Sequence, residues 1–218
     1  MIQSTGGIVL RSRPLTETSL IIHWLTPDFG RIATVAKGAR RPKSPFAGKL
    51  DLFYTADFSF SRSRKSDLHI LREVNLRATR AAIRPDIFKL RQAAYAVNFI
   101  EQTTETETPL ANVFELLREF LDFLTAENTG AATVFAIELK LLRELGLTPD
   151  FAGASLTAGT KKIAQALSQN DWRALARLKL TDAQIIELRQ FLHGFLIFHL
   201  SRLPPGRDAA LAGENAEK

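Results

Sequence analysis

Residues 30–50 read GRIATVAKGARRPKSPFAGKL, a strand-like segment followed by a strongly basic loop. In the first part, Ile32, Thr34 and Ala36 occupy alternate positions and share one face, which predicts a β-strand. Gly38 ends this pattern, and two prolines and another glycine keep the next ten residues out of a ladder or a helix. The stretch therefore predicts a sheet strand that carries a long loop at its end.

Five cations and no carboxylate lie in residues 37–49 of this stretch: Lys37, Arg40, Arg41, Lys43 and Lys49. They repel one another unless an anion is present, and a nucleic-acid backbone turns that repulsion into attraction by releasing condensed counterions. A solvated charge run is the plainer alternative. We favour binding, because Phe46 and the prolines stiffen the loop and offer a ring for base stacking.

Strand patterns cover the rest of residues 1–80 as well: Ile8–Leu10, Leu20–Leu25, Leu50–Phe60 and Leu68–Val74. Tyr54, Phe58 and Phe60 share one face, where strict alternation with polar residues favours a core position over a stacking surface. Five short strands with one long basic loop predict a small closed barrel of the OB type. These residues also hold 14 Lys and Arg against six Asp and Glu, so we expect the nucleic-acid contacts here.

From residue 84 the apolar period changes from two to about 3.6, which predicts an α-helical domain over residues 81–205. Thr181 and Gln184 have capping-box spacing and open a long helix that runs to about Leu200. The end of this helix, Phe191–Leu200, is apolar almost all round, so we expect it at the buried centre of a bundle. Residues 206–218 are predicted to be a disordered tail. The predicted fold class is α+β, a barrel domain followed by a helical domain.

The composition argues against several classes of protein. The chain has no cysteine, which rules out disulfides and thiolate metal sites and fits a cytosolic protein. No apolar run has the length of a membrane span. Phosphate-binding loops, zinc-protease motifs and cysteine nucleophiles are missing too. We therefore expect no catalytic residue, no bound metal and no cofactor.

The pair Gly30-Arg31 followed by Lys37–Ser44 resembles the most distinctive motif of the bacterial RecO family of recombination mediators. The likeness extends over residues 1 to about 207, through Gly7–Arg13, Leu141–Pro149 and Phe195–Arg207. It implies the same barrel fold for the first part of the chain. Many family members carry a cysteine-bearing zinc module after the segment that ends here at Pro149. This chain has only Asp150–Thr160 in that place, so we expect the zinc module to be absent.

The resemblance also implies a function. A member of this family is expected to bind single- and double-stranded DNA and to anneal complementary strands. Its implied partners are RecR and the single-stranded-DNA-binding protein, with which it assists the loading of RecA. We expect a cytoplasmic protein that joins the nucleoid when bound to DNA. An RNA-binding OB module is the alternative among binding proteins, and a metal-dependent nuclease is the alternative among enzymes.

The predicted DNA contacts are the cations of the strand and loop together with those of a second basic turn: Arg31, Lys37, Arg40, Arg41, Lys43, Lys49, Arg62, Arg64 and Lys65. For the acidic, apolar-ended tail of the single-stranded-DNA-binding protein, the resemblance implies a groove in the helical half. Lys140 and Arg143 lie one turn apart on a predicted helix, so we expect them to bind its carboxylates. Leu139 and Leu142 are expected to line this groove.

Overall fold

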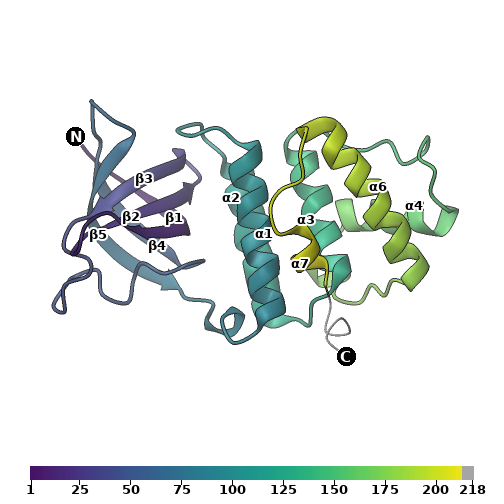
Figure 1. Cartoon of the computed structure of the whole chain (residues 1–218), viewed down its shortest axis with the longest axis horizontal. Coiled ribbons are helices and arrows are strands. Elements are labelled where there is room, and N and C mark those ends of the chain that lie inside the picture. Colours follow the sequence, from purple (N-terminus) through teal and green to yellow (C-terminus); the bar gives the residue numbers. More distant parts are fainter. Residues whose placement is uncertain (213–218) are drawn as a thin grey trace. The chain divides into compact units, whose positions relative to one another are not determined.

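The computed structural model describes residues 1–212, which form two compact units. The first combines Met1–Arg80 with Thr104–Arg118, and the second combines Ala81–Thr103 with the residues from Glu119 onward. The first is built on a β-barrel and the second on α-helices, as the sequence predicts (Figure 1). The return of residues 104–118 to the barrel unit has no signal in the hydrophobic pattern.

The barrel has five strands: β1 (Ile2–Pro14), β2 (Leu20–Thr26), β3 (Gly30–Ala36), β4 (Thr55–Ser61) and β5 (Leu68–Ala78). They form a closed sheet in the order β1-β2-β3-β5-β4, and β4 pairs with β1 to complete it. All neighbours are antiparallel except β3 and β5, which run parallel from the pair Ala33–Leu68 to the pair Val35–Ile70. This arrangement confirms the predicted small barrel of the OB type.

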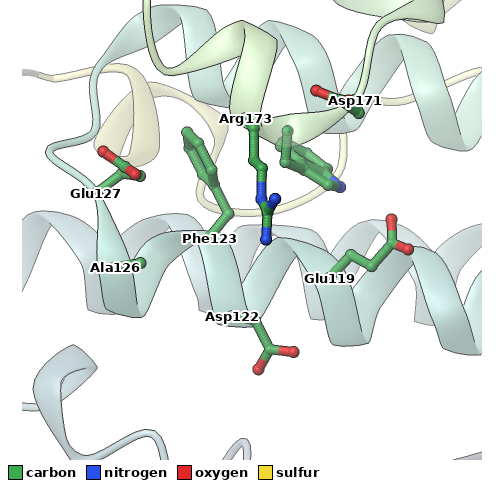
Figure 2. A pocket seen from close by; sticks show the side chains of 8 residues that line it. Glu119, Asp122, Phe123, Ala126, Glu127, Asp171 and Arg173 are labelled. Atoms are coloured by element: carbon green, nitrogen blue, oxygen red, sulfur yellow. The ribbon is translucent and has the colours of Figure 1, made fainter.

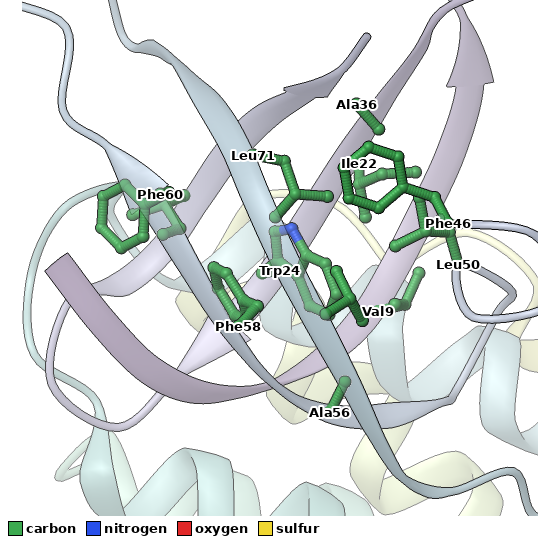
Figure 3. Packing of buried hydrophobic residues seen from close by; sticks show 12 residues of the cluster. Val9, Ile22, Trp24, Ala36, Phe46, Leu50, Ala56, Phe58, Phe60 and Leu71 are labelled. Atoms are coloured by element: carbon green, nitrogen blue, oxygen red, sulfur yellow. The ribbon is translucent and has the colours of Figure 1, made fainter. Parts of the chain in front are cut away.

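Side chains from all five strands fill the barrel (Figure 3). Trp24 stacks on Phe58 with ring centroids 4.2 Å apart, and its Nε1–H donates a 2.9 Å hydrogen bond to Thr34 Oγ1. Phe58 and Phe60 are 3% and 1% exposed, which confirms that they are core residues. Large aromatic rings bury much apolar area, so they account for a large share of the stability of this small barrel.

The predicted fourth strand begins too early. Residues 50–54 form turns, because Phe53 adopts a left-handed backbone with φ 66° that cannot continue a ladder. The Phe53 side chain is only 4% exposed, and regular pairing starts only at Thr55. The alternating pattern of residues 50–60 therefore covers a partly buried turn as well as a strand.

Residues 81–212 are mainly helical, with a 3-10 turn, η1 (Ala81–Ile83), and these helices: α1 (Ile87–Thr103), α2 (Ala111–Ala126), α3 (Ala131–Glu144), α4 (Ala158–Gln169), α5 (Trp172–Leu175), α6 (Asp182–Leu200) and α7 (Arg207–Leu211). The capping box predicted for α6 is confirmed. The Gln184 N–H donates to Thr181 Oγ1, and the Thr181 N–H donates to Gln184 Oε1. Over residues 1–212, none of the helices has the length and apolar content needed to cross a membrane.

The prediction that Phe191–Leu200 is buried all round is wrong. The buried residues of α6 are Leu188, Leu192 and Leu196, which form one stripe at a spacing of four residues. Phe198 is 83% exposed and Ile197 is 43% exposed. Helix α6 therefore packs on the helical core by a single face and presents a second apolar face to solvent.

The first part of the predicted disordered tail is ordered, because Arg207–Leu211 forms α7. Arg207 is 2% exposed, and its guanidinium donates two hydrogen bonds to the Glu138 carboxylate, of 2.6 Å from Nε and 3.1 Å from Nη2. The Tyr95 hydroxyl donates a third, of 2.5 Å, to the same carboxylate. This buried ion pair anchors the C-terminal segment to α3. Residues 213–218 of the predicted tail lie outside the described residues.

Candidate nucleic-acid interface

The basic loop, residues 37–49, follows β3 and consists of consecutive tight turns. The Arg41 N–H donates to the Gly38 carbonyl at 3.1 Å, and the Arg40 N–H donates to the Thr18 carbonyl at 2.9 Å, which ties the loop to the β1–β2 turn. Four of its five predicted contact residues are exposed to solvent: Lys37, Arg40, Arg41 and Lys43. The positive charge is therefore presented on structured backbone.

The expectation that Phe46 stacks on nucleic-acid bases is wrong. Its side chain is 7% exposed and lies in the barrel core together with Leu50 (Figure 3). Phe46 does stiffen the loop, because the ring anchors its far end in the barrel. An anchored loop loses less conformational freedom when a ligand binds, so its cations can contact phosphates at a smaller entropic cost.

Arg31 and Lys49 differ from the other predicted contact residues because both are half-buried. Arg31 Nη2 donates to the Thr104 carbonyl, and Lys49 Nζ donates to the Val74 carbonyl at 3.2 Å. These bonds hold both side chains against the barrel. We therefore expect them to contribute less to phosphate binding than the four exposed cations, and their assignment stays a prediction.

Two arginines that the sequence analysis did not single out, Arg11 and Arg13, are exposed on β1. Arg13 pairs with Ile21, which in turn pairs with Val35, so Arg13 lies on the same sheet face as Val35 and about 10 Å away across two strand spacings. Lys37 follows Val35 by two residues. Arg11 and Arg13 occupy alternate positions of one strand, so their side chains share a face. This spacing could have indicated from the sequence that the basic surface extends onto β1.

The second basic turn, residues 62–66, connects β4 with β5 and exposes Arg62, Arg64 and Lys65. Arg62 donates a 2.5 Å hydrogen bond to Glu107 Oε2, so part of its charge is neutralised within the same unit. This turn therefore offers a weaker positive potential than the basic loop. Its three cations remain predicted contacts of lower rank.

His69 lies beneath this turn and is 2% exposed. The Ser63 N–H donates to His69 Nδ1 at 3.4 Å, and His69 Nε2 lies 3.3 Å from Glu107 Oε1. Burial lowers the pKa of His69, although the negative charge of Glu107 acts in the opposite direction. The imidazole is therefore neutral near pH 7, with its proton on Nε2, and it adds no positive charge to the basic turn.

Lys140 and Arg143, the predicted ligands of the partner tail, lie on α3 and bond to the protein itself. Lys140 is 5% exposed, and its Nζ donates to the Asn170 carbonyl at 2.5 Å. Arg143 is exposed, and its Nη1 donates to the Ser168 carbonyl at 2.7 Å. Both carbonyls belong to the C-terminal end of α4, where cations offset the unpaired carbonyl groups and the negative end of the helix dipole.

The expectation that Leu139 and Leu142 line a groove is wrong. They are 1% and 0% exposed, because α3 has ten buried residues among its 14 and occupies the interior position that the sequence analysis gave to the end of α6. A peptide cannot reach either leucine without unpacking this core. The assignment of Lys140 and Arg143 to the partner tail stays a prediction.

In the part of the chain that the structure describes, no three His, Asp or Glu side chains gather closely enough to hold a metal ion. Because the basic loop presents four exposed cations on structured backbone, the barrel and this loop are the strongest candidate for a functional site.

Comparison with known proteins assigns both parts of the chain to one family. The family model described as "Recombination protein O N terminal" matches residues 1–80, and "Recombination protein O C terminal" matches residues 84–153. The DNA repair protein RecO of Exiguobacterium sibiricum is 29% identical over 93% of this chain and 82% of its own length. Those of Alkaliphilus metalliredigens and Bacillus subtilis are each 30% identical, over 79% and 69% of this chain and 67% and 58% of their own lengths. The chain belongs to the RecO family of DNA repair proteins.

Proposed function

We propose that this protein binds DNA strands through the basic loop and promotes their annealing during recombinational repair. One observation carries the proposal. Four exposed cations are held on a chain of tight turns whose far end is anchored in the barrel by Phe46. Membership of a DNA repair family supports DNA as the polyanion.

The mechanism that we infer is charge neutralisation. Each phosphate that a Lys or Arg contacts releases condensed counterions, and two strands held beside one basic surface repel each other less than they do in free solution. Phosphate contacts carry no sequence information directly, so we expect binding and annealing with little sequence preference. The barrel aromatics Trp24, Phe58 and Phe60 are buried, so base stacking on them adds nothing to affinity.

A salt titration of oligonucleotide binding tests this proposal. Changing Arg40, Arg41 and Lys43 to Ala is expected to weaken binding to every sequence and to flatten the plot of log affinity against log salt, by about 0.7 for each single-strand phosphate that the variant no longer neutralises. The matched control changes Lys162, Arg177 and Lys179 to Ala, which removes the same net charge from exposed positions of the second unit. An unchanged slope in the loop variant, or an equal loss of affinity in the control, contradicts the assignment of the loop. Alanine at Arg62, Arg64 and Lys65 is expected to have a smaller effect.

The same preparation separates the two alternative functions. Competition between DNA and RNA oligonucleotides of one sequence identifies an RNA-binding module if RNA wins. Cleavage of a labelled strand that depends on a divalent metal ion identifies a nuclease. We expect DNA to compete at least as well as RNA, and no cleavage.

We further propose the wider role of the family for this chain: loading of RecA on strands covered by the single-stranded-DNA-binding protein, together with RecR, in the cytoplasm. For the acidic, apolar-ended tail of the single-stranded-DNA-binding protein, the exposed face of α6 is now the better candidate than Lys140 and Arg143. It offers the half-buried rings of Phe191 and Phe195 and the exposed ring of Phe198 as an apolar surface. Arg189 and Arg202 are exposed nearby in the sequence and supply positive charge.

A labelled peptide of that acidic tail tests the α6 assignment. Changing Phe198 to Ala and Arg202 to Ala is expected to weaken peptide capture and to leave DNA affinity unchanged, since surface charges act locally and are screened beyond about 10 Å at ordinary salt. The α6 assignment is contradicted if this variant captures the peptide as well as wild type does. If the variant that changes Lys140 and Arg143 to Glu then captures it more weakly, the binding site lies on α3.

A further inference from the structure

The second unit contains a hollow of about 570 Å³ between the C-terminal half of α2 and the start of α5, which we call the acidic hollow (Figure 2). Its size falls within the range of about 300–1,000 Å³ that is typical of binding pockets for small groups. The inner wall is aromatic, because Phe123 and Trp172 contact each other with ring centroids 5.3 Å apart. They are 8% and 7% exposed, so each shows only part of its ring to the hollow.

The rim of the acidic hollow is charged. Four carboxylates line it, from Glu119, Asp122, Glu127 and Asp171, against a single guanidinium, from Arg173. All four carboxylate residues are exposed. This local negative charge contrasts with the positive formal charge of the whole chain, +6. An aromatic wall below a ring of carboxylates is complementary to a cation with an apolar stem, because the stem packs on the ring faces while the head stays near the carboxylates.

Two cations of the protein itself already use this wall and rim. Figure 2 shows the Arg173 side chain extending across the hollow, with its guanidinium between Phe123 and Glu119 and directed toward Asp122. The ammonium group of Lys140 lies 5.4 Å from the ring centroid of Trp172. Burial and then Arg143 lower the pKa of Lys140, whereas the charges of Glu119 and Asp171 act in the opposite direction, so the field of the rim reaches the inner wall.

We propose that the acidic hollow binds an arginine side chain of a partner protein, which displaces Arg173 and takes its place between the aromatic wall and the carboxylates. Arginine is favoured over lysine because a planar guanidinium stacks on aromatic rings and is less strongly hydrated than an ammonium group. The acidic tail of the single-stranded-DNA-binding protein is excluded from this site by like-charge repulsion. The proposal is therefore independent of the α6 assignment and of DNA binding by the basic loop.

The two tryptophans of the chain provide the measurement. Trp172 lies in the acidic hollow, whereas Trp24 is 0% exposed in the barrel core and serves as an internal control. In protein with isotope-labelled tryptophan, N-acetyl-arginine methylamide is expected to shift the Trp172 indole resonance with a dissociation constant on the order of 1 mM, and to leave Trp24 unshifted. The matched uncharged probe, N-acetyl-citrulline methylamide, is expected to produce no saturable shift.

Three variants fix the interpretation, with thermal melting as the check on folding. Changing Glu119 to Gln together with Asp122 to Asn is expected to weaken arginine binding about three- to tenfold, as two exposed ion pairs allow. Changing Glu115 to Gln, on the same helix but outside the hollow, is expected to leave it unchanged. Changing Arg173 to Ala removes the internal competitor and is expected to tighten binding about two- to fivefold. The proposal is overturned by equal shifts with the citrulline probe, by an unshifted Trp172, or by weaker binding to the Arg173 variant.

Discussion

The buried ion pair between Glu138 and Arg207 is the electrostatic feature of the second unit whose disruption is expected to destabilise the protein most. The two side chains are 0% and 2% exposed, and their two hydrogen bonds are of 2.6 and 3.1 Å. Changing Glu138 to Gln keeps the shape of the side chain but leaves a buried guanidinium without its counter-charge. Breaking a buried pair from one side costs about 3–5 kcal/mol of unfolding free energy. For a chain of this size, that loss corresponds to a fall of about 6–20 °C in Tm.

A thermal melt followed by circular dichroism at a helical wavelength measures this loss, because the second unit supplies most of the helix. The matched control is Glu115 to Gln, which breaks the exposed pair of Glu115 and Arg118 on α2 and is expected to cost at most about 1 kcal/mol. The triple variant Glu138→Leu, Arg207→Met, Tyr95→Phe replaces all three hydrogen-bonded polar side chains by apolar ones. It is expected to recover most of the unfolding free energy that Glu138→Gln loses. A loss for Glu138→Gln no larger than that of the control refutes the reasoning, because it means that water or another group compensates the buried charge.

Two further predictions concern the barrel and α6. His69 has a lowered pKa in the folded protein, so its neutral form stabilises the fold above its unfolded pKa of about 6.5, and this contribution is lost as the pH falls through the folded value. The Tm difference between wild type and His69→Gln is therefore expected to shrink from pH 7.5 to pH 5, and a constant difference contradicts the prediction. Leu192→Ala, at a buried position of α6, is expected to lower the free energy of unfolding by about 2–5 kcal/mol. Phe198→Ala, on the exposed face, is expected to change it by less than about 0.5 kcal/mol. Equal losses for the two variants in denaturant melts would mean that the exposed face is packed in solution.

The sequence carries enough local information to predict the barrel, and much less to predict which helix occupies the interior. Period-two patterns and turn residues indicated all five strands and located β2 and β3 closely, since a strand in a small barrel must alternate to fill it. They covered only Ile8–Leu10 of β1 and missed the last four residues of β5. The end of α6, Phe191–Leu200, is apolar almost all round, whereas α3 carries Glu138 and Lys140, so composition favours the end of α6 for the centre. The structure reverses this choice, because the two charges of α3 find partners on α7 and at the end of α4. Those partners are 69 and 30 residues away in the sequence, where no local pattern can indicate them.

The candidate site, too, could be predicted from the sequence only in part. The charge of the basic loop and the exposure of its cations follow from residue type, because Lys and Arg are seldom buried without a partner. The burial of Phe46 does not follow from it, because an aromatic ring on a basic loop suits a base or a core equally well. The bonds that hold Arg31 and Lys49 to backbone carbonyls depend on segments 73 and 25 residues away, which only the fold brings into contact.

The return of residues 104–118 to the barrel unit has a practical meaning for dissecting this protein. The Glu107 N–H donates to the Arg31 carbonyl at 3.0 Å, and the Leu110 N–H donates to the Pro27 carbonyl at 3.2 Å. Glu107 also faces His69, and the Thr104 carbonyl accepts from Arg31. A fragment cut after residue 80 therefore exposes polar groups that the intact chain pairs, although a family model ends at that residue. The folding unit that presents the basic loop is discontinuous along the gene, so its DNA affinity belongs to the whole polypeptide and is best measured there.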